Sequence, residues 1–450
     1  MTQNIQIKLG DCIDIMKTIR DNSIDSIVTD PPAGISFMGK EWDKDKGGRD
    51  KWIEWMELVA KECLRILKPG GHAFVWALPR TSHWTATAWE NAGFEVRDRV
   101  GHIFGSGFPK SMNISKQIDK TAGKEQEIIG KYQLPNGQEW NLKQAEDTAV
   151  NGSGGTFTAS KRRTLEITAP ATEESKQWDG WGTALKPATE DWWLFRKPIS
   201  EKTVTENVLK WGTGAININA SRVPVNPEVD DMLRTVERKE RDSETWKNGS
   251  GFKNENNHVT GVPPIGRWPA NLVHDGSDDV LELFPQTAPS HIGKPRGTVK
   301  KGLFANSDFN KVGTEHEDSG SAARFFYCAK ASRSERNDGL DGIEEKDVPY
   351  SDYRKEMKTT DSFVSKYPDG SPRPMNKLKN AHPTVKPLAL MRYLITLVTP
   401  PNGVVLDPFL GSGSTLVAAK ELGFSGRGIE KDPEYFEIAK ARINDAESIT

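Results

Sequence analysis

One short stretch of the chain combines an acid with two prolines directly after an apolar run. Ile27 and Val28 lead toward Asp30, and Pro31 and Pro32 follow at once. Proline fixes φ and stiffens the backbone, so a carboxylate in this position is held in place. Taken alone, the pattern fits either a rigidly placed catalytic carboxylate or an acid that caps a helix while the prolines end a strand.

A second stretch, VVLDPFLGSGSTLVAA at 404–419, reads as strand, turn and helix. Gly411 and Gly413 lie in the turn, where missing side chains let a ligand approach the backbone and free N–H groups favour an anionic group. No GK[ST] follows, so the turn is not a phosphate-binding P-loop. Glu430 ends the next predicted strand, about twenty residues later, where an acid commonly binds a ribose hydroxyl pair. The stretch predicts a nucleoside-cofactor site; its alternative is an ordinary tight turn beside a solvated acid.

Together the two stretches resemble the amino-group DNA methyltransferases, which use S-adenosylmethionine. Their order resembles the permuted (beta) group of that family, in which the catalytic motif precedes the cofactor motif. Two segments strengthen the resemblance, NAHPTVKPLALM at 380–391 and GDCIDIM at 10–16. A third, LKPATEDWWLFRKP at 185–198, departs from the family in having Thr189 where His is usual. The resemblance covers about residues 1–115, 180–225 and 381–450.

The resemblance implies a mechanism. The Asp30 carboxylate and the Pro31 carbonyl would each accept an N–H hydrogen bond from the target amine and localise its lone pair for one-step methyl transfer. The target base would first be flipped out of its duplex. Asp rather than Ser at the head of the motif favours adenine N6, with cytosine N4 as the alternative.

The resemblance also implies which residues form the site. The residues implied to be catalytic are Asp30, Pro31, Pro32, Ala33, Phe37 and Trp42. Those implied to bind S-adenosylmethionine are Asp11, Cys12, Asp30, His382, Thr384, Lys386, Asp407, Pro408, Phe409, Gly411, Ser412, Gly413, Ser414, Glu430 and Lys431. Asp11 would meet the adenine of the cofactor.

Ala33 departs from the family, which usually has Tyr, Phe or Trp there to stack on the flipped base. Such stacking is worth about 1–3 kcal/mol per base, and alanine cannot provide it. Three explanations stay open. Another ring takes over the stacking, that of Phe37, Trp42 or Trp76. Otherwise the chain binds DNA with weakened or lost catalysis, or the alanine is an engineered inactivation.

The elements that must position these motifs alternate between strand and helix. Strands are predicted at 5–11, 23–30, 72–77, 94–104, 191–198, 321–332, 403–409 and 425–430. Helices are predicted at 52–67, 82–93, 387–398, 414–423 and 433–445. This alternation predicts an α/β fold with a doubly wound, mostly parallel, Rossmann-like sheet.

The middle of the chain is rich in Gly, Asn and Lys and predicts long loops. We therefore divide the chain into a catalytic half of a methyltransferase domain (1–118), a loop-rich insert (119–178), a return to the sheet (179–224), an inserted target-recognition region (225–379) and a cofactor-binding half (380–450). In the permuted order, the helix at 433–445 would lead to the strand at 5–11 across a chain break. Residues near Gln3 and Ile443 are therefore expected to be neighbours.

The overall charge does not by itself indicate a nucleic-acid-binding protein. The formal net charge is −2, and residues 101–380 carry as many Lys and Arg as Asp and Glu. DNA binding therefore has to use local basic clusters, or aromatic wedges such as Trp246, Trp268 and Phe304. The candidate clusters lie at 160–164, 234–242, 294–301 and 329–336.

Cysteine spacing and hydropathy limit the remaining classes. Cys12, Cys63 and Cys328 lie far apart with no CxxC pair, so neither a zinc site nor a disulfide framework is expected. No membrane-spanning run or signal peptide is seen, so a cytoplasmic protein without a membrane partner is predicted. DNA is the expected partner, and a homodimer and a cognate restriction nuclease are left open. RNA and protein-amide methyltransferases are disfavoured because they usually carry Asn at the Asp30 position and lack so large a middle region.

Overall fold

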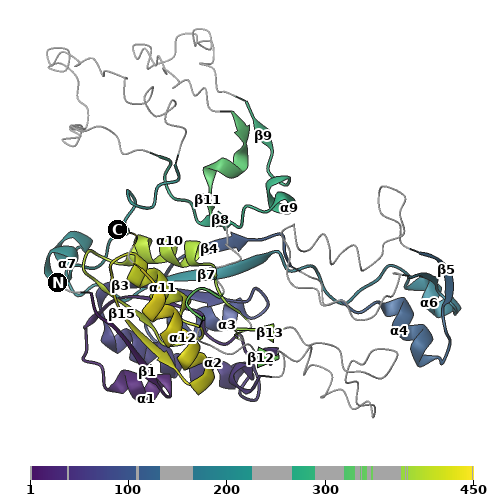
Figure 1. Cartoon of the computed structure of the whole chain (residues 1–450), viewed down its shortest axis with the longest axis horizontal. Coiled ribbons are helices and arrows are strands. Elements are labelled where there is room, and N and C mark those ends of the chain that lie inside the picture. The colour runs from purple at the N-terminus through teal and green to yellow at the C-terminus, as the bar shows by residue number, and fades with distance from the viewer. Residues whose placement is uncertain are drawn as a thin grey trace, which may run out of the picture.

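The computed structural model in Figure 1 describes residues 3–37, 40–107, 111–131, 166–224, 266–288, 319–329, 335, 337–341, 346–347, 377–380, 382, 384–447 and 449. The described residues build a nine-stranded mixed sheet. Its strands, in order across the sheet, are β1 (Ile5–Leu9), β15 (Ser425–Glu430), β14 (Val404–Asp407), β2 (Ile24–Thr29), β3 (Leu67–Ala77), β7 (Thr189–Arg196), β4 (Glu95–Ile103), β8 (Leu272–His274) and β11 (Tyr327–Cys328). All neighbours pair in parallel except β7, which runs antiparallel to both β3 and β4.

The strand order identifies the place where a ligand would bind. With β14 and β15 counted as strands 1 and 2, β1 to β4 as 3 to 6 and β7 as 7, the sheet order reads 3-2-1-4-5-7-6. Its first five positions follow the order of doubly wound dinucleotide-binding sheets. Such sheets bind ligands outside the carboxyl ends of their strands where the order reverses, which here lies between β14 and β2. The predicted doubly wound fold is confirmed.

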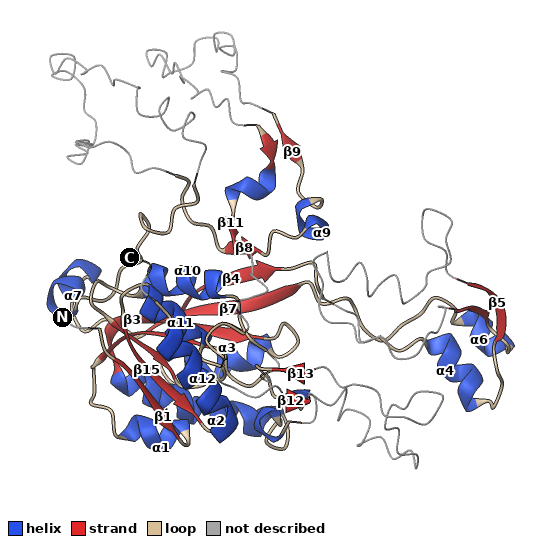
Figure 2. Cartoon of the chain, viewed as in Figure 1, coloured by secondary structure: helices blue, strands red, loops and turns tan. Residues whose placement is uncertain are grey.

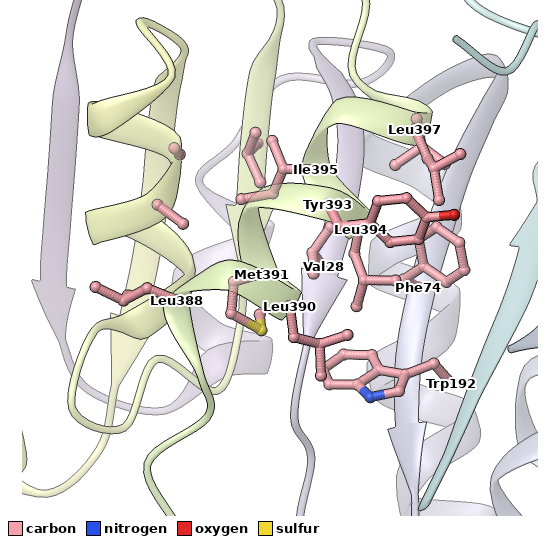
Figure 3. Close-up of a cluster of buried hydrophobic side chains, with 14 of the residues drawn as sticks. Val28, Phe74, Trp192, Leu388, Leu390, Met391, Tyr393, Leu394, Ile395 and Leu397 are labelled. Carbon is pink, nitrogen blue, oxygen red and sulfur yellow. The ribbon is translucent and has the colours of Figure 1, made fainter. Parts of the chain in front are cut away.

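Helices cover both faces of this sheet (Figure 2). On one face lie α1 (Cys12–Lys17), α2 (Arg49–Ile66) and α3 (Ser82–Asn91), and on the other α10 (Leu388–Val398), α11 (Ser414–Glu421) and α12 (Pro433–Asp445). Alternate strand residues feed the two cores because successive side chains point to opposite faces. Ile27 packs with the first set of helices, whereas Val28 packs with the second. Figure 3 shows Val28, Phe74 and Trp192 beneath the apolar side chains of α10.

The two ends of the chain meet beside α11. The Gln3 side chain donates to the Lys420 carbonyl (2.7 Å), and the Ile449 N–H donates to the Glu421 carbonyl (2.9 Å). Lys420 in turn donates from Nζ to the Ile443 carbonyl (2.8 Å). The prediction that residues near Gln3 and Ile443 are neighbours is confirmed.

One local prediction was wrong. The segment 321–332 is not one strand: a 3-10 turn, η4 (Ala322–Phe325), separates β10 (Gly320–Ser321) from β11. The Ser321 side chain accepts from the Ala323 N–H, which starts this turn in spite of the following aromatic residues. Strand β3 begins at Leu67, directly after α2 and five residues before the predicted strand at 72–77, and includes Gly70 with φ +79°.

A small unit stands apart from the sheet (Figures 1 and 2). It consists of α4 (Ile114–Thr121), β5 (Glu127–Lys131), β6 (Glu166–Ala169) and α6 (Glu173–Gln177). The buried Asp119 carboxylate accepts from the Ala171 and Thr172 N–H groups and from the Gln126 amide, which joins its two halves. The predicted loop-rich insert at 119–178 therefore contains ordered elements at both ends.

Other described elements are short. They are η2 (Glu41–Asp43), α7 (Val204–Trp211), α9 (Asp278–Leu281), β9 (Gln286–Thr287), β12 (Lys346–Asp347) and β13 (Lys377–Leu378). The basic clusters at 160–164, 234–242 and 294–301, most of the cluster at 329–336, and the aromatic residues Trp246 and Phe304 lie outside the described residues. Across the described ranges, no helix has the length and apolar character needed to cross a membrane.

Candidate active site

The predicted motifs converge at the carboxyl edge of the sheet, around the point where the strand order reverses. Asp30 directly follows β2, Asp407 ends β14 and Glu430 ends β15. Parallel strands bring these ends to one edge although Asp30 and Asp407 are far apart in sequence. The edge between β14 and β2 therefore carries an acid from each neighbouring strand.

Asp30 is held by an ion pair. Its Oδ2 lies 2.8 Å from Nζ of Lys386, whose side chain is only 9% exposed. The ammonium group also lies over the ring of Trp76, 4.1 Å from its centroid. Burial raises the pKa of Asp30 to about 6, although the charge and hydrogen bond of Lys386 oppose this. The Asp30 carboxyl is therefore ionised at neutral pH, and less firmly so than an exposed aspartate.

Asp407 holds the two strand ends together. Its carboxylate accepts from the hydroxyls of Thr29 (2.7 Å) and Thr415 (2.6 Å) and from the Phe409 N–H (3.0 Å). Thr29 is the residue before Asp30, so this bond ties the catalytic motif directly to the glycine turn. Burial raises the pKa of Asp407 despite these hydrogen bonds. Asp407 thus orients the backbone on both sides of the site.

The glycine turn leads from β14 into α11. Gly411 has φ +55° and Gly413 has φ +86°, a region that favours glycine. A side chain at position 411 would place its Cβ 2.8 Å from Nε2 of His382. At Gly413, a Cβ would come within 3.1 Å of Ala439 on α12. The turn therefore needs both glycines for its conformation and for its close neighbours.

Glu430 and Asp11 lie at adjacent strand ends beside this turn. Glu430 accepts from the N–H groups of Gly411 and Asp432, both at 2.7 Å, and burial raises its pKa. The Gly10 N–H donates to the Glu430 carbonyl (2.8 Å), so the loop carrying Asp11 is bound to the end of β15. Asp11 caps α1 by accepting from the Ile13 N–H and lies 3.3 Å from Lys431.

These residues fit a nucleoside cofactor. A carboxylate has about four lone-pair positions, so Glu430 keeps acceptor capacity for ribose hydroxyls beyond its two backbone bonds. Asp11 stands one strand further along, where a base attached to that ribose would extend. Cys12 is buried, and burial raises the pKa of its thiol to about 12, so the thiol stays protonated at neutral pH.

Trp42 lies on the cofactor side of the site. Its ring is parallel to that of His382, with centroids 6.4 Å apart and 12° between planes. His382 also meets the edge of Tyr435, with centroids 4.6 Å apart. Because His382 borders Gly411, this aromatic group stands against the glycine turn. The Thr384 N–H lies 3.4 Å from Nδ1 of His382, so the two predicted residues share one loop.

The loop after the catalytic motif is organised by a residue that sequence reasoning missed. Asp43 is 1% exposed, and its carboxylate accepts from the N–H groups of Gly34, Ile35 and Phe37. The Ala33 carbonyl accepts from the Thr81 hydroxyl (3.0 Å). The backbone that follows Asp30, Pro31 and Pro32 is therefore fixed from both sides. An acid six to nine residues downstream of the N–H groups that it binds has no distinctive sequence pattern.

Arg442 was also missed. Its guanidinium is 3% exposed and donates to the Ser412 carbonyl (2.7 Å), to the Ser412 hydroxyl and to the Ser414 hydroxyl. A buried arginine in the last turn of an amphipathic helix reads in sequence as an ordinary surface residue.

Phe409 packs on Trp55 of α2, with ring centroids 5.9 Å apart, which anchors the Pro408–Phe409 end of the glycine turn.

Glu190 is the third residue that sequence reasoning missed. Glu190 is the second residue of β7. Because β7 runs antiparallel to β3, the beginning of β7 lies at the carboxyl end of β3. Burial alone would raise the pKa of Glu190, but the charge of Lys386 and the neighbouring His102 and Trp76 side chains together outweigh it and lower that pKa to about 2. Its Oε2 lies 3.9 Å from Nδ1 of the buried His102. An acid in an otherwise apolar strand, ATEDWWLF, was the available signal.

A profile of the DNA methylase family (N6 and N4 type) matches residues 24–441. The chain belongs to the DNA methylase family. The match spans both the catalytic motif and the glycine turn, so the two halves of the site fall inside one family pattern. The predicted family resemblance is confirmed at this level.

Curated relatives of this DNA methylase match over shorter stretches. Type II methyltransferase M2.LlaDCHI of Lactococcus lactis subsp. cremoris is 46% identical over 68 residues, 15% of this chain and 25% of the relative. M.HinfI of Haemophilus influenzae is 43% identical over 67 residues (15% and 19%), and M.BamHI of Bacillus amyloliquefaciens is 35% identical over 74 (16% and 17%). The chain therefore matches no more than a quarter of the length of these relatives.

Proposed function

We propose that this DNA methylase transfers a methyl group from S-adenosylmethionine to the exocyclic N6 amine of adenine in DNA. The observation that carries the proposal is the position of Asp30, a partly buried carboxylate held by Lys386 beside the glycine turn. Family membership supports S-adenosylmethionine as the cofactor and DNA as the substrate. The aspartate at the head of the motif is our reason for preferring adenine N6 to cytosine N4.

The residues of the chain would act by positioning and electrostatics. Glu430 and Asp11 would hold the ribose and adenine of the cofactor, which supplies a methyl group on a positively charged sulfur. Asp30 and the Pro31 carbonyl would accept the two N–H bonds of the target amine and direct its lone pair. An amine that gains a methyl group carries a positive charge until it releases a proton, and the Asp30 carboxylate stabilises that charge.

Three features of the proposal extend beyond this corner. The motif order is that of the circularly permuted group, and the meeting of the chain ends supports it. The region 225–379, with the insert 119–178, would recognise DNA. A cognate restriction nuclease is a natural partner because the relatives are Type II methyltransferases.

The decisive experiment is a transfer assay. The protein is incubated with tritiated S-adenosylmethionine and unmethylated DNA, and the DNA is digested to nucleosides. Label in N6-methyladenine supports the proposal, whereas label in N4-methylcytosine replaces it with the cytosine reaction. Tight cofactor binding with no label in DNA identifies a DNA-binding protein that has lost catalysis.

The variant Asp30→Ala tests the role of Asp30 in methyl transfer. We expect this variant to keep cofactor binding and to lose methyl transfer, because Glu430 and Asp11 would hold the cofactor whereas Asp30 would accept from the target amine. Unchanged turnover in Asp30→Ala would remove Asp30 from the mechanism.

A further inference from the structure

In the catalytic corner, by which we mean Asp30 and the side chains around it, the negative charge of Asp30 is already balanced. Asp30 and Lys386 form a close pair at 2.8 Å, so together they carry no net charge. A neutral pair gives little stabilisation to the positive charge that develops on the target nitrogen. A second nearby acid would restore one net negative charge.

We propose that Glu190 is a positioning residue of the transfer reaction, whose charge acts on Lys386 together with that of Asp30 and keeps the catalytic corner negatively charged. The inference rests on the proposed function. Glu190 acts through Lys386 and is not expected to touch the target base.

The strand geometry brings Glu190 to this corner. Glu190 lies two residues before Trp192, on the same face of β7, because alternate side chains share a face. Trp192 pairs in register with Trp76 of β3, whose ring lies under the Lys386 ammonium at 4.1 Å. Lys386 therefore stands between the end of β2, with Asp30, and the beginning of β7, with Glu190.

The surrounding charges favour this arrangement. The charges of Glu190 and the buried Asp407 raise the pKa of Asp30, whereas that of Lys386 lowers it. Lys386 and His102 both lower the pKa of Glu190. The pKa of Asp30 is about 6 and that of Glu190 about 2, so a proton entering the corner goes to Asp30. Glu190 stays charged over the whole working range. The alternative is that Glu190 only packs the junction of β4 and β7, opposite His102.

The test compares Glu190→Gln with Asp191→Asn. Asp191 is the next residue on β7, is buried, and lies on the opposite face beside Arg99 (3.7 Å), so its substitution is a loss of one negative charge away from the corner. We expect Glu190→Gln to lower kcat by about ten- to a hundredfold, less than removal of a directly contacting group. KM for the cofactor and the thermal midpoint should change little, and Asp191→Asn should keep wild-type kcat.

The pH profile separates an electrostatic role from a packing role. The negative charge of Glu190 raises the pKa of Asp30, so Glu190→Gln should move the acid limb of kcat/KM to lower pH, by about one unit or less. Lys386→Met removes the opposing charge and should move it to higher pH. The double variant should be non-additive, because the two residues act through one charge.

A second readout does not depend on turnover. In pH-difference infrared spectra, the band of the protonated Asp30 carboxyl, assigned by its loss in Asp30→Asn, should appear at lower pH in Glu190→Gln. If wild-type protein transfers no methyl group to DNA, the proposed function fails, and this band still decides whether the two acids are coupled. An unshifted band, kcat within twofold of wild type, or an equal effect of Asp191→Asn would each overturn the role of Glu190.

Discussion

Asp30 differs from an ordinary surface aspartate in both its partner and its surroundings. It is bound by a buried ammonium group, and burial raises its pKa to about 6. The charged form is the one that accepts hydrogen bonds from an amine. The site therefore depends on a group that begins to gain a proton only slightly below neutral pH.

This pKa predicts the pH dependence of the reaction. Because the carboxylate is the active form, kcat/KM should fall as pH decreases through about 6, rather than near 4 as for an exposed aspartate. Steady-state rates of methyl transfer between pH 5 and pH 8.5 measure this acid limb of the kcat/KM profile. Full activity at pH 5 would contradict the assignment of Asp30 as the titrating acceptor.

Ala33 is the other position on which we expect activity to depend. The structure places Trp42 against His382 and covers Trp76 with Lys386, so Phe37 is the remaining nearby ring of the three considered. We expect Ala33→Tyr to raise turnover by supplying a stacking surface worth about 1–3 kcal/mol. Turnover and the fluorescence of 2-aminopurine at the target position measure the effect. Lower turnover would indicate that Phe37 already occupies the space beside the flipped base.

At the scale of elements, the loop after Pro32 depends on one internal carboxylate. Asp43 accepts three backbone N–H groups from residues 34–37, and the loop also contains Gly34 with φ +71° against Trp52. Loss of this acceptor leaves buried donors without a partner, which is costly. The loop is therefore a folded part of the active site and not a loose connection.

Asp43→Ala should lower the free energy of unfolding by at least about 2 kcal/mol, because several buried N–H groups lose their acceptor. Asp43→Asn keeps one acceptor oxygen and should cost less. Asp45→Asn is the control, since its carboxylate makes one exposed bond to the Gly47 N–H, and its effect should stay within about 0.5 kcal/mol. Urea unfolding measures all three, and equal losses for Asp43→Ala and Asp45→Asn would contradict this role.

The elements differ in how far the sequence could predict them. Asp30 and Glu430 were predictable because each directly follows or ends a strand, and Gly411 because it lies in the glycine-rich turn between a strand and a helix. Glu190 reaches the same edge from the beginning of an antiparallel strand, and Asp43 and Arg442 bind backbone groups of other loops. Those partners depend on tertiary packing, which local periodicity does not contain. The wrong strand at 321–332 shows the same limit, since a single Ser321 cap outweighed the pattern of four residues, Phe325 to Cys328.

At the scale of the whole molecule, the sheet joins two parts of the chain that are distant in sequence. Strands β14 and β15 from the C-terminal part lie between β1 and β2 from the N-terminal part. The chain ends meet at neighbouring carbonyls of α11, those of Lys420 and Glu421. The order of the strands in the sheet therefore does not follow their order along the chain.

This arrangement predicts tolerance of a further permutation. A chain in which Ile449 is joined to Gln3 by a short Gly/Ser linker, with new ends between residues 224 and 266, should fold with a thermal midpoint within about 4 °C of wild type. It should also keep cofactor affinity, measured by calorimetry. New ends between Ile429 and Glu430 should prevent folding, because they cut β15. If the first permutant does not fold, the existing order of segments along the chain is required for folding.

The Asp30–Lys386 pair also limits when activity can appear during synthesis of the chain. Asp30 is synthesised near the start of the chain, whereas Lys386, the glycine turn and Glu430 all come in its last 70 or so residues. A growing chain carries the acid long before it carries the counter-charge or the cofactor turn. A ribosome-bound fragment that ends before Lys386 should thus be unable to modify DNA, and activity should appear only when translation has passed Glu430.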